Sequence, residues 1–130
     1  MAGLTFDAGV LVAAERNDRQ FWSFWRVAME RGVVPCVPTT ALAQAWRGSR
    51  SARLAQLLEA CEIDPLDETL AKRSGELCAR TRTRDVIGAS VVVTATLRGD
   101  DILTTDPSEL KALLPTRSRI KVIDLRKPKL

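Results

Sequence analysis

The sequence predicts a three-layer α/β domain with a short, mostly parallel central sheet that is flanked by helices. Short apolar runs that suit buried strands alternate along the chain with longer segments of helical periodicity, which is the pattern of a parallel sheet. Gly, Pro and Asp residues mark the boundaries between these segments. With 130 residues, 45% hydrophobic and 28% charged, the chain can form one core and has the balance of a globular domain.

The N-terminal half is predicted to alternate strands with helices from its first residues. Strands are expected over residues 4–6, 33–38 and 62–66, and helices from about residue 10 and over residues 20–31, 39–46 and 51–61. Thr39 or Thr40 can cap the third of these helices. Prolines place the ends of the 33–38 strand outside a regular ladder, and the 62–66 strand is expected at an edge.

The C-terminal half continues the same alternation. Helices are expected over residues 67–81, 85–98 and 107–114, and strands over residues 102–104 and 120–124. Gly99 ends the long helix, and Asp100 and Asp101 are expected in a solvent-exposed turn. The domain is predicted over residues 1–125, followed by a mobile basic tail over residues 126–130.

Composition excludes several classes of function. The chain has no histidine, so Ser-His-Asp and Cys-His catalysis and imidazole metal sites are excluded. A net charge of +4 favours a polyanionic partner. Cys36, Cys61 and Cys78 are odd in number and lack metal-site spacing, so reduced core thiols are expected. Without a membrane-spanning run or a signal-peptide pattern, we expect a cytoplasmic protein.

Three aspartates stand where a ligand site forms in a parallel sheet. Asp7 and Asp106 each follow a short apolar strand and precede a helix, so they converge if both strands are central and parallel. Asp85 begins the long helix and can enter the same crevice from the side. Three carboxylates around one point repel each other unless a divalent cation joins them. Each aspartate also has a structural alternative as a helix cap, and the two roles are compatible.

Three segments together give a resemblance to a known family. They are Asp7-Ala8-Gly9-Val10-Leu11 after the first strand, Leu42-Ala43-Gln44-Ala45-Trp46-Arg47-Gly48 after the proline-containing strand, and Leu103-Thr104-Thr105-Asp106. In this order and spacing they resemble a PIN domain. In length and element order the chain is similar to the VapC-like toxin ribonucleases of type II toxin–antitoxin systems.

The resemblance implies a magnesium- or manganese-dependent endoribonuclease that cleaves structured RNA, forms a homodimer and is silenced by a small cognate antitoxin. Asp7 matches the family's first acid and Asp106 its last. Gln44 stands where the family usually has a glutamate, and is expected to align water or metal. Gly88 stands where another aspartate is expected, and Asp85, one helical turn earlier, is the available substitute.

These two departures leave a second function open, a PIN-fold protein that binds RNA or antitoxin without cleaving. Gly88→Asp is expected to raise metal affinity and cleavage if the natural site is depleted of acids. An unrelated α/β protein that binds a small molecule is disfavoured, because the chain has no glycine-rich phosphate loop.

Other candidate residues are basic, hydroxylic or aromatic. The candidate phosphate contacts are five arginines, with a solvated charged face as the alternative. They are Arg47, Arg50, Arg53, Arg82 and Arg84. Thr104 or Thr105 can orient a metal-bound water or be a packed strand residue. Trp22, Phe24 and Trp25 recur at helical spacing, which favours core or a partner interface over base stacking.

Overall fold

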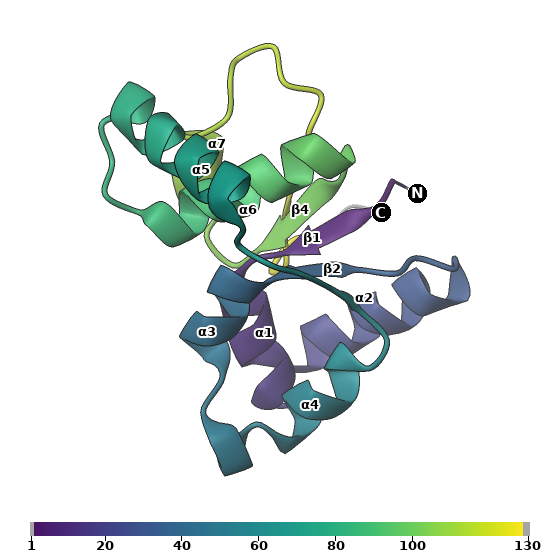
Figure 1. Cartoon of the computed structure of the whole chain (residues 1–130). Coiled ribbons are helices and arrows are strands. Elements are labelled where there is room, and N and C mark those ends of the chain that lie inside the picture. Colours follow the sequence, from purple (N-terminus) through teal and green to yellow (C-terminus); the bar gives the residue numbers. More distant parts are fainter. Residues whose placement is uncertain (1, 129–130) are drawn as a thin grey trace.

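The computed structural model describes residues 2–128 and confirms the α/β class (Figure 1). Within these residues, five strands form one sheet in the order β3-β2-β1-β4-β5, and every neighbouring pair is parallel. The strands are β1 (Leu4–Phe6), β2 (Cys36–Pro38), β3 (Glu62–Asp64), β4 (Asp101–Thr104) and β5 (Val122–Asp124). β1 and β4 are neighbours near the middle of the sheet, and β3 is an edge strand as predicted.

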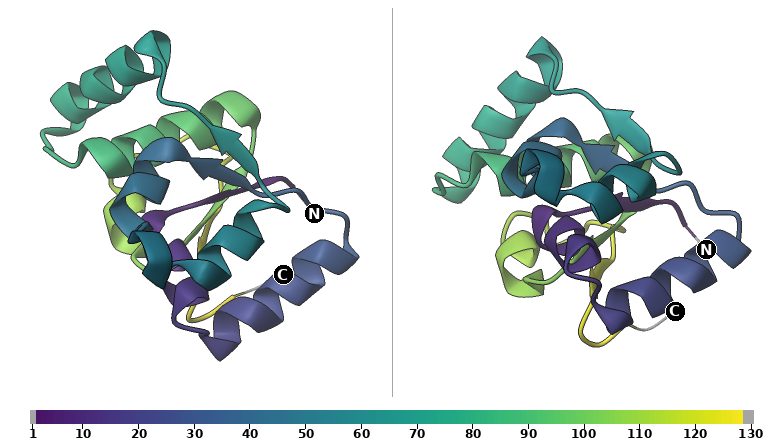
Figure 2. Two further views of the ribbon diagram at one scale, coloured as in Figure 1. Left: turned by 60° about the horizontal axis from the view of Figure 1, so that its bottom comes forward. Right: turned by 90° about the horizontal axis from the view of Figure 1, so that it is seen from below.

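Helices cover both faces of this sheet. They are α1 (Ala8–Glu15), α2 (Arg19–Glu30), α3 (Thr39–Ala45), α4 (Ala52–Leu58), α5 (Glu68–Thr81), α6 (Val86–Arg98) and α7 (Pro107–Lys111), with a 3-10 turn η1 (Gly48–Arg50). Helices α1, α2 and α4 lie on one side of the sheet and α5 and α6 on the other (Figure 1). α6 packs on the strands and α5 packs on α6, which makes α5 the outer helix (Figure 2). In residues 2–128, no helix is long and apolar enough to span a membrane.

Aspartates begin most of the helices. The side chains of Asp18, Asp67, Asp85 and Asp106 accept hydrogen bonds from backbone N–H groups in the first turns of α2, α5, α6 and α7. Such caps satisfy N–H groups that have no partner within the helix. The predicted threonine cap of α3 is wrong, because α3 starts directly after Pro38 with no side-chain cap. α7 also ends earlier than predicted, at Lys111.

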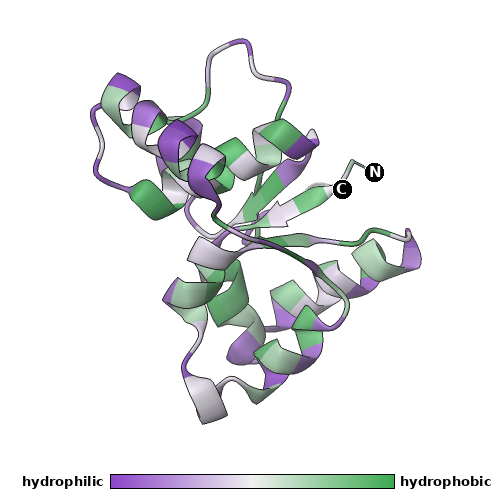
Figure 3. Ribbon diagram, in the orientation of Figure 1, coloured by the Kyte–Doolittle hydropathy of each residue, from purple (hydrophilic) through white to green (hydrophobic). Residues whose placement is uncertain are grey.

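The core lies between the sheet and the helices that cover it. Hydropathy colouring shows apolar residues along the strands and α6, with hydrophilic residues over much of α5 (Figure 3). Leu4, Phe6, Ile102, Leu103 and Val91 are all fully buried. Each side chain of this kind stabilises the fold by about 1.5–3 kcal/mol through burial alone. Phe24 is also in the core, and Trp22 and Trp25 pack partly buried against it.

The cysteines are free thiols, as expected. Cys36 and Cys78 are buried and Cys61 is half-buried. Burial raises the pKa of Cys36 to about 11 and that of Cys61 to about 12, so both thiols stay protonated near neutral pH.

Asp100 corrects one prediction, because it is buried rather than exposed in the turn before β4. Its Oδ2 atom accepts hydrogen bonds of 2.9 Å from the Thr5 hydroxyl and from Arg98 Nε. The pairing with Arg98 compensates the charge that burial would otherwise leave unsolvated. This cluster lies at the amino ends of β1 and β4.

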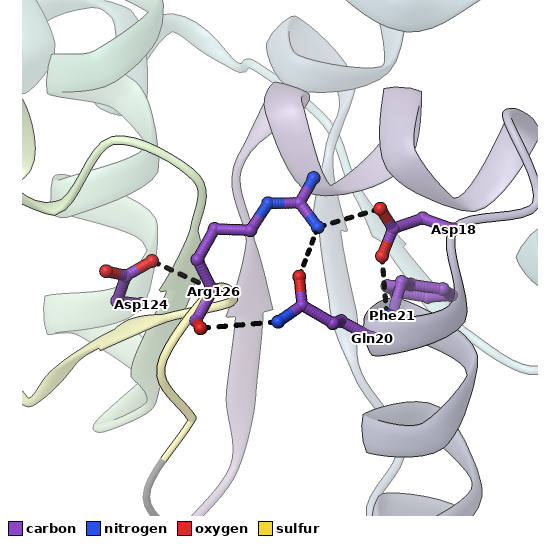
Figure 4. A network of polar contacts seen from close by, with 5 residues as sticks. All are labelled: Asp18, Gln20, Phe21, Asp124 and Arg126. Carbon is purple, nitrogen blue, oxygen red and sulfur yellow. Dashed lines mark hydrogen bonds and ion pairs between the residues drawn. The ribbon is translucent and has the colours of Figure 1, made fainter.

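The chain end is tied to the domain as far as Arg126. Leu125 is fully buried. Arg126 Nη1 lies 2.7 Å from Asp18 Oδ2 and 2.7 Å from Gln20 Oε1, and Asp124 Oδ1 accepts a hydrogen bond from Arg126 N (Figure 4). Arg126, which the sequence places in the predicted mobile tail, thus makes side-chain contacts with the start of α2. Residues 129 and 130 of that tail lie outside the described residues.

Candidate functional site

Asp7 and Asp106 follow the carboxyl ends of the neighbouring strands β1 and β4. Phe6 pairs with Leu103 in the ladder, and the Asp7 N–H donates to the Leu103 carbonyl at 3.0 Å. The buried Thr104 then connects the two acids. Its hydroxyl donates to Asp7 Oδ2 at 2.8 Å, and its oxygen accepts from Asp106 N at 3.0 Å.

Asp85 reaches the same region from the N-terminus of α6. Its Oδ1 atom accepts a hydrogen bond of 2.9 Å from Gly88 N, and its own N–H donates to the Thr83 hydroxyl. Gly88 is buried beneath this carboxylate. α6 packs on β1 and β4, and this packing positions Asp85 relative to the ends of those strands.

Glu109 is a fourth acid that the sequence prediction did not place in the site. It lies one helical turn after Asp106 on α7, and its N–H donates to Asp106 Oδ1 at 3.4 Å. In the sequence, Glu109 is explained as the glutamate of a capping box at the start of its helix, and that role does not point to a place in the pocket. Its spacing of three residues from Asp106 is the signal that places both on one helix face.

These residues line one pocket of about 180 Å³. Its polar lining includes Asp7, Gln44, Asp85, Asp106 and Glu109. Gln44 comes from α3, which contacts both α1 and α6. The structure thus brings together all four residues that the sequence predicted as catalytic and adds Glu109.

Two of the pocket acids, Asp7 and Glu109, have raised pKa values. Burial raises the pKa of Asp7, with smaller contributions from the charges of Asp85 and Asp106, while hydrogen bonds from Thr104 and Ala8 oppose the rise. Hydrogen bonding to Asp85 and Asp106, burial and the charges of both raise the pKa of Glu109 to about 7. Crowded carboxylates favour the neutral form because like charges repel.

The described residues provide no cation for this pocket. The ion pairs in residues 2–128 join other groups, and none includes a pocket acid. In the same residues, no three Asp, Glu, Cys or His side chains are already arranged to hold a metal ion. Both oxygens of Asp7 accept hydrogen bonds, whereas Asp85 Oδ2 and Asp106 Oδ2 accept none from a backbone N–H group or a hydroxyl of the described residues. Hard oxygen donors of this kind suit magnesium or manganese that keeps several waters.

The predicted phosphate-binding arginines lie on two segments. Arg47, Arg50 and Arg53 follow α3, in and around η1 and α4, and Arg82 and Arg84 lie between α5 and α6. All five are exposed. Arg84 directly precedes Asp85, and Arg47 follows Gln44 by three residues, so each segment adjoins one that contributes to the pocket.

The fold has known counterparts. The structure superposes on a chain of the VapBC2 complex from Rickettsia felis bound to a promoter DNA fragment, with a TM-score of 0.72, 10% identity, and coverage of 93% of this chain and 97% of that one. This chain has the fold of a VapBC chain. A chain of a toxin–antitoxin complex from Klebsiella pneumoniae matches with a TM-score of 0.72 and 15% identity. The match covers 96% of this chain and 99% of the Klebsiella chain.

A third counterpart is a chain of DNA-bound VapBC from Salmonella typhimurium, with a TM-score of 0.65, 16% identity, and coverage of 96% and 99%. No family model matches the sequence, and no curated protein matches it either. The likeness to VapBC chains is therefore one of fold.

Proposed function

We propose that this protein is the toxin of a type II toxin–antitoxin pair and a magnesium- or manganese-dependent endoribonuclease. The observation that carries the proposal is the pocket in which Asp7, Asp85, Asp106 and Glu109 meet, with no cation from residues 2–128. The pocket lies at the carboxyl ends of parallel strands, where α/β sheets bind ligands. The fold shared with VapBC chains supports the same interpretation.

Each pocket residue has a distinct task in this proposal. Asp7, Asp85 and Asp106 would hold the cation, and Gln44 would orient water or the cation through its amide. A bound magnesium or manganese ion supplies Lewis acidity for hydrolysis of a phosphodiester. Thr104 keeps Asp7 and Asp106 in register through its two hydrogen bonds.

RNA and protein partners follow from the same interpretation. The five exposed arginines would place the RNA backbone beside the pocket, since guanidinium groups pair well with phosphate. A small antitoxin would silence the toxin, and two copies of the chain would form a homodimer. Light scattering of the purified protein tests the dimer directly.

A second candidate is a PIN-fold protein that binds RNA or antitoxin without cleaving. It is favoured by the neutral amide of Gln44, by the missing side chain at Gly88 and by the engagement of both Asp7 oxygens in protein hydrogen bonds. Fewer free anionic oxygens lower the affinity for a divalent cation.

Cleavage of total cellular RNA by the purified, antitoxin-free protein decides between the two. Discrete products are expected with magnesium or manganese, and they should disappear with a chelator and in Asp7→Asn. Asp64→Asn is the matched control, because Asp64 also ends a parallel strand but does not line the pocket. If a folded protein binds RNA or antitoxin but yields no products, the binding function replaces the ribonuclease.

A further inference from the structure

Gly88 leaves a space that the Asp85 carboxylate fills. A β-carbon at position 88 would overlap Asp85 Oδ2 and would lie 2.8 Å from Asp85 Cγ. Contacts to a β-carbon below 3.0 Å essentially do not occur, so a side chain at position 88 must displace the carboxylate. Asp85 can lie where it does only because residue 88 is glycine.

The backbone does not require glycine at this position. Gly88 lies within α6, whereas the glycines with positive φ are Gly32, Gly48 and Gly99. Glycine is a poor residue for a helix interior, because it loses more conformational freedom on folding than alanine does. The helix therefore gains nothing from this glycine by itself.

We propose that Gly88 is a positioning residue, whose missing side chain lets the Asp85 carboxylate take the orientation in which it caps α6 and also presents Oδ2 to the pocket. The inference rests on the proposed function, because it concerns how that site acquires one of its acids. Gly88 N donates a hydrogen bond to Asp85 Oδ1, and Asp85 Oδ2 occupies the space over Gly88 and accepts no hydrogen bond from a backbone N–H group or a hydroxyl of the described residues. One residue thus fixes both oxygens of the acid that precedes it by one turn.

This arrangement changes the expectation for Gly88→Asp. From the sequence, that replacement adds an acid to a depleted site and should raise metal affinity. In the structure, its β-carbon would overlap Asp85 Oδ2, so the Asp85 carboxylate would have to turn away as the new acid enters. Moving the acid from position 85 to position 88 therefore needs two replacements, Gly88→Asp and Asp85→Ser. The smaller serine side chain clears the space over position 88, and its hydroxyl can still cap α6.

The first test needs no metal. In the parent protein, Gly88→Ala should lower the unfolding temperature, because the new methyl group overlaps Oδ2 and forces the Asp85 carboxylate out of its capping orientation. In an Asp85→Ala background the same replacement should raise it, since cap and clash are both gone and alanine is the better helix former. Gly75→Ala is the matched control, because Gly75 lies in α5 with open space at its β-position, and it should raise the unfolding temperature in both backgrounds. If Gly88→Ala stabilises the parent as Gly75→Ala does, the proposal is overturned.

The second test measures Mn²⁺ binding by titration calorimetry or electron paramagnetic resonance. Gly88→Ala and Asp85→Asn should weaken binding by a similar factor, on the order of tenfold. The double variant Asp85→Ser with Gly88→Asp should recover much of that loss. Unchanged binding in Gly88→Ala would overturn the proposal. A parent protein that binds no Mn²⁺ would overturn the proposed metal-dependent function, while the metal-free test would still decide whether Gly88 positions Asp85.

Discussion

At the scale of single residues, Thr104 shows how one buried side chain organises the candidate site. It donates to Asp7 and accepts from the backbone of Asp106, so both hydrogen-bonding roles of its hydroxyl are used. Thr94 is also buried, but its hydroxyl has no partner among the described residues. The two threonines form a natural pair for comparison.

Thr104→Val should lower the free energy of unfolding by about 1–3 kcal/mol, because it leaves a partly buried Asp7 oxygen and the Asp106 N–H without their hydrogen-bond partner. The same change at Thr94 should be neutral or stabilising, since it removes a buried hydroxyl that makes no hydrogen bond. Urea denaturation of both variants and the parent measures the difference. Equal losses at the two positions would contradict the assigned role of Thr104.

Glu109 allows a prediction about pH. Its pKa is raised from 4.5 to about 7, so between these values the folded protein binds a proton more tightly than the unfolded chain does. Stability from this group is present below about pH 4.5 and is lost as the pH rises through 7. Thermal unfolding in chelator should therefore show a decline over this window that is smaller in Glu109→Gln. Parallel pH profiles for the two proteins would disprove the assignment.

At the scale of elements, the structure shows that helix caps and pocket acids can be the same residues. Asp85 and Asp106 cap α6 and α7 and also line the pocket. Asp18 caps α2 and instead ties it to the chain end through Arg126 (Figure 4). Asp18 therefore stabilises α2 and its contact with Arg126, whereas Asp85 both stabilises α6 and lines the pocket.

Asp18→Ala should cost more stability than Arg126→Ala. The first change removes an N-cap, worth about 0.5–2 kcal/mol, as well as the ion pair. The second removes a partly exposed ion pair, worth about 0–1 kcal/mol. A double-mutant cycle followed by chemical denaturation isolates the pair. If Arg126→Ala loses more stability than Asp18→Ala, the contacts of Arg126 stabilise the fold more than the Asp18 cap of α2 does.

At the scale of the whole molecule, the charges divide between an acidic pocket and a basic exterior. The chain carries a net charge of +4, yet four carboxylates line one pocket of about 180 Å³. Exposed arginines adjoin the pocket on the segments before α6 and after α3. Such a surface favours a polyanion that brings phosphate to the arginines and a divalent cation to the acids.

RNA affinity should therefore fall with salt, and Arg84→Ala should reduce the slope of log affinity against log salt by about 0.7 for a lost contact to single-stranded RNA. Arg31→Ala is the control, because Arg31 is an exposed arginine at the end of α2, before the chain enters β2. Fluorescence anisotropy with labelled RNA in chelator gives both slopes. An equal effect of the two changes would argue against a defined RNA path at Arg84.

The sequence by itself determined the order and approximate places of the five strands, most helix caps and the positions of Asp7 and Asp106 after their strands; β2, β3 and β5 are shorter than predicted. These features depend on residues close together in the chain, where periodicity and capping chemistry act. The absence of histidine is likewise a property of the sequence alone, and it restricts the possible chemistry to carboxylates, hydroxyls, amides, lysine and arginine.

Only the tertiary structure decided how distant segments complete the site. The Thr104–Asp7 hydrogen bond joins residues 97 positions apart, and the approach of Glu109 to Asp85 depends on how α7 packs against α6. The burial of Asp100 depends on Thr5, 95 positions earlier in the chain. Local patterns do not encode such contacts, because their free energy comes from desolvation and charge interactions that exist only once the elements have packed.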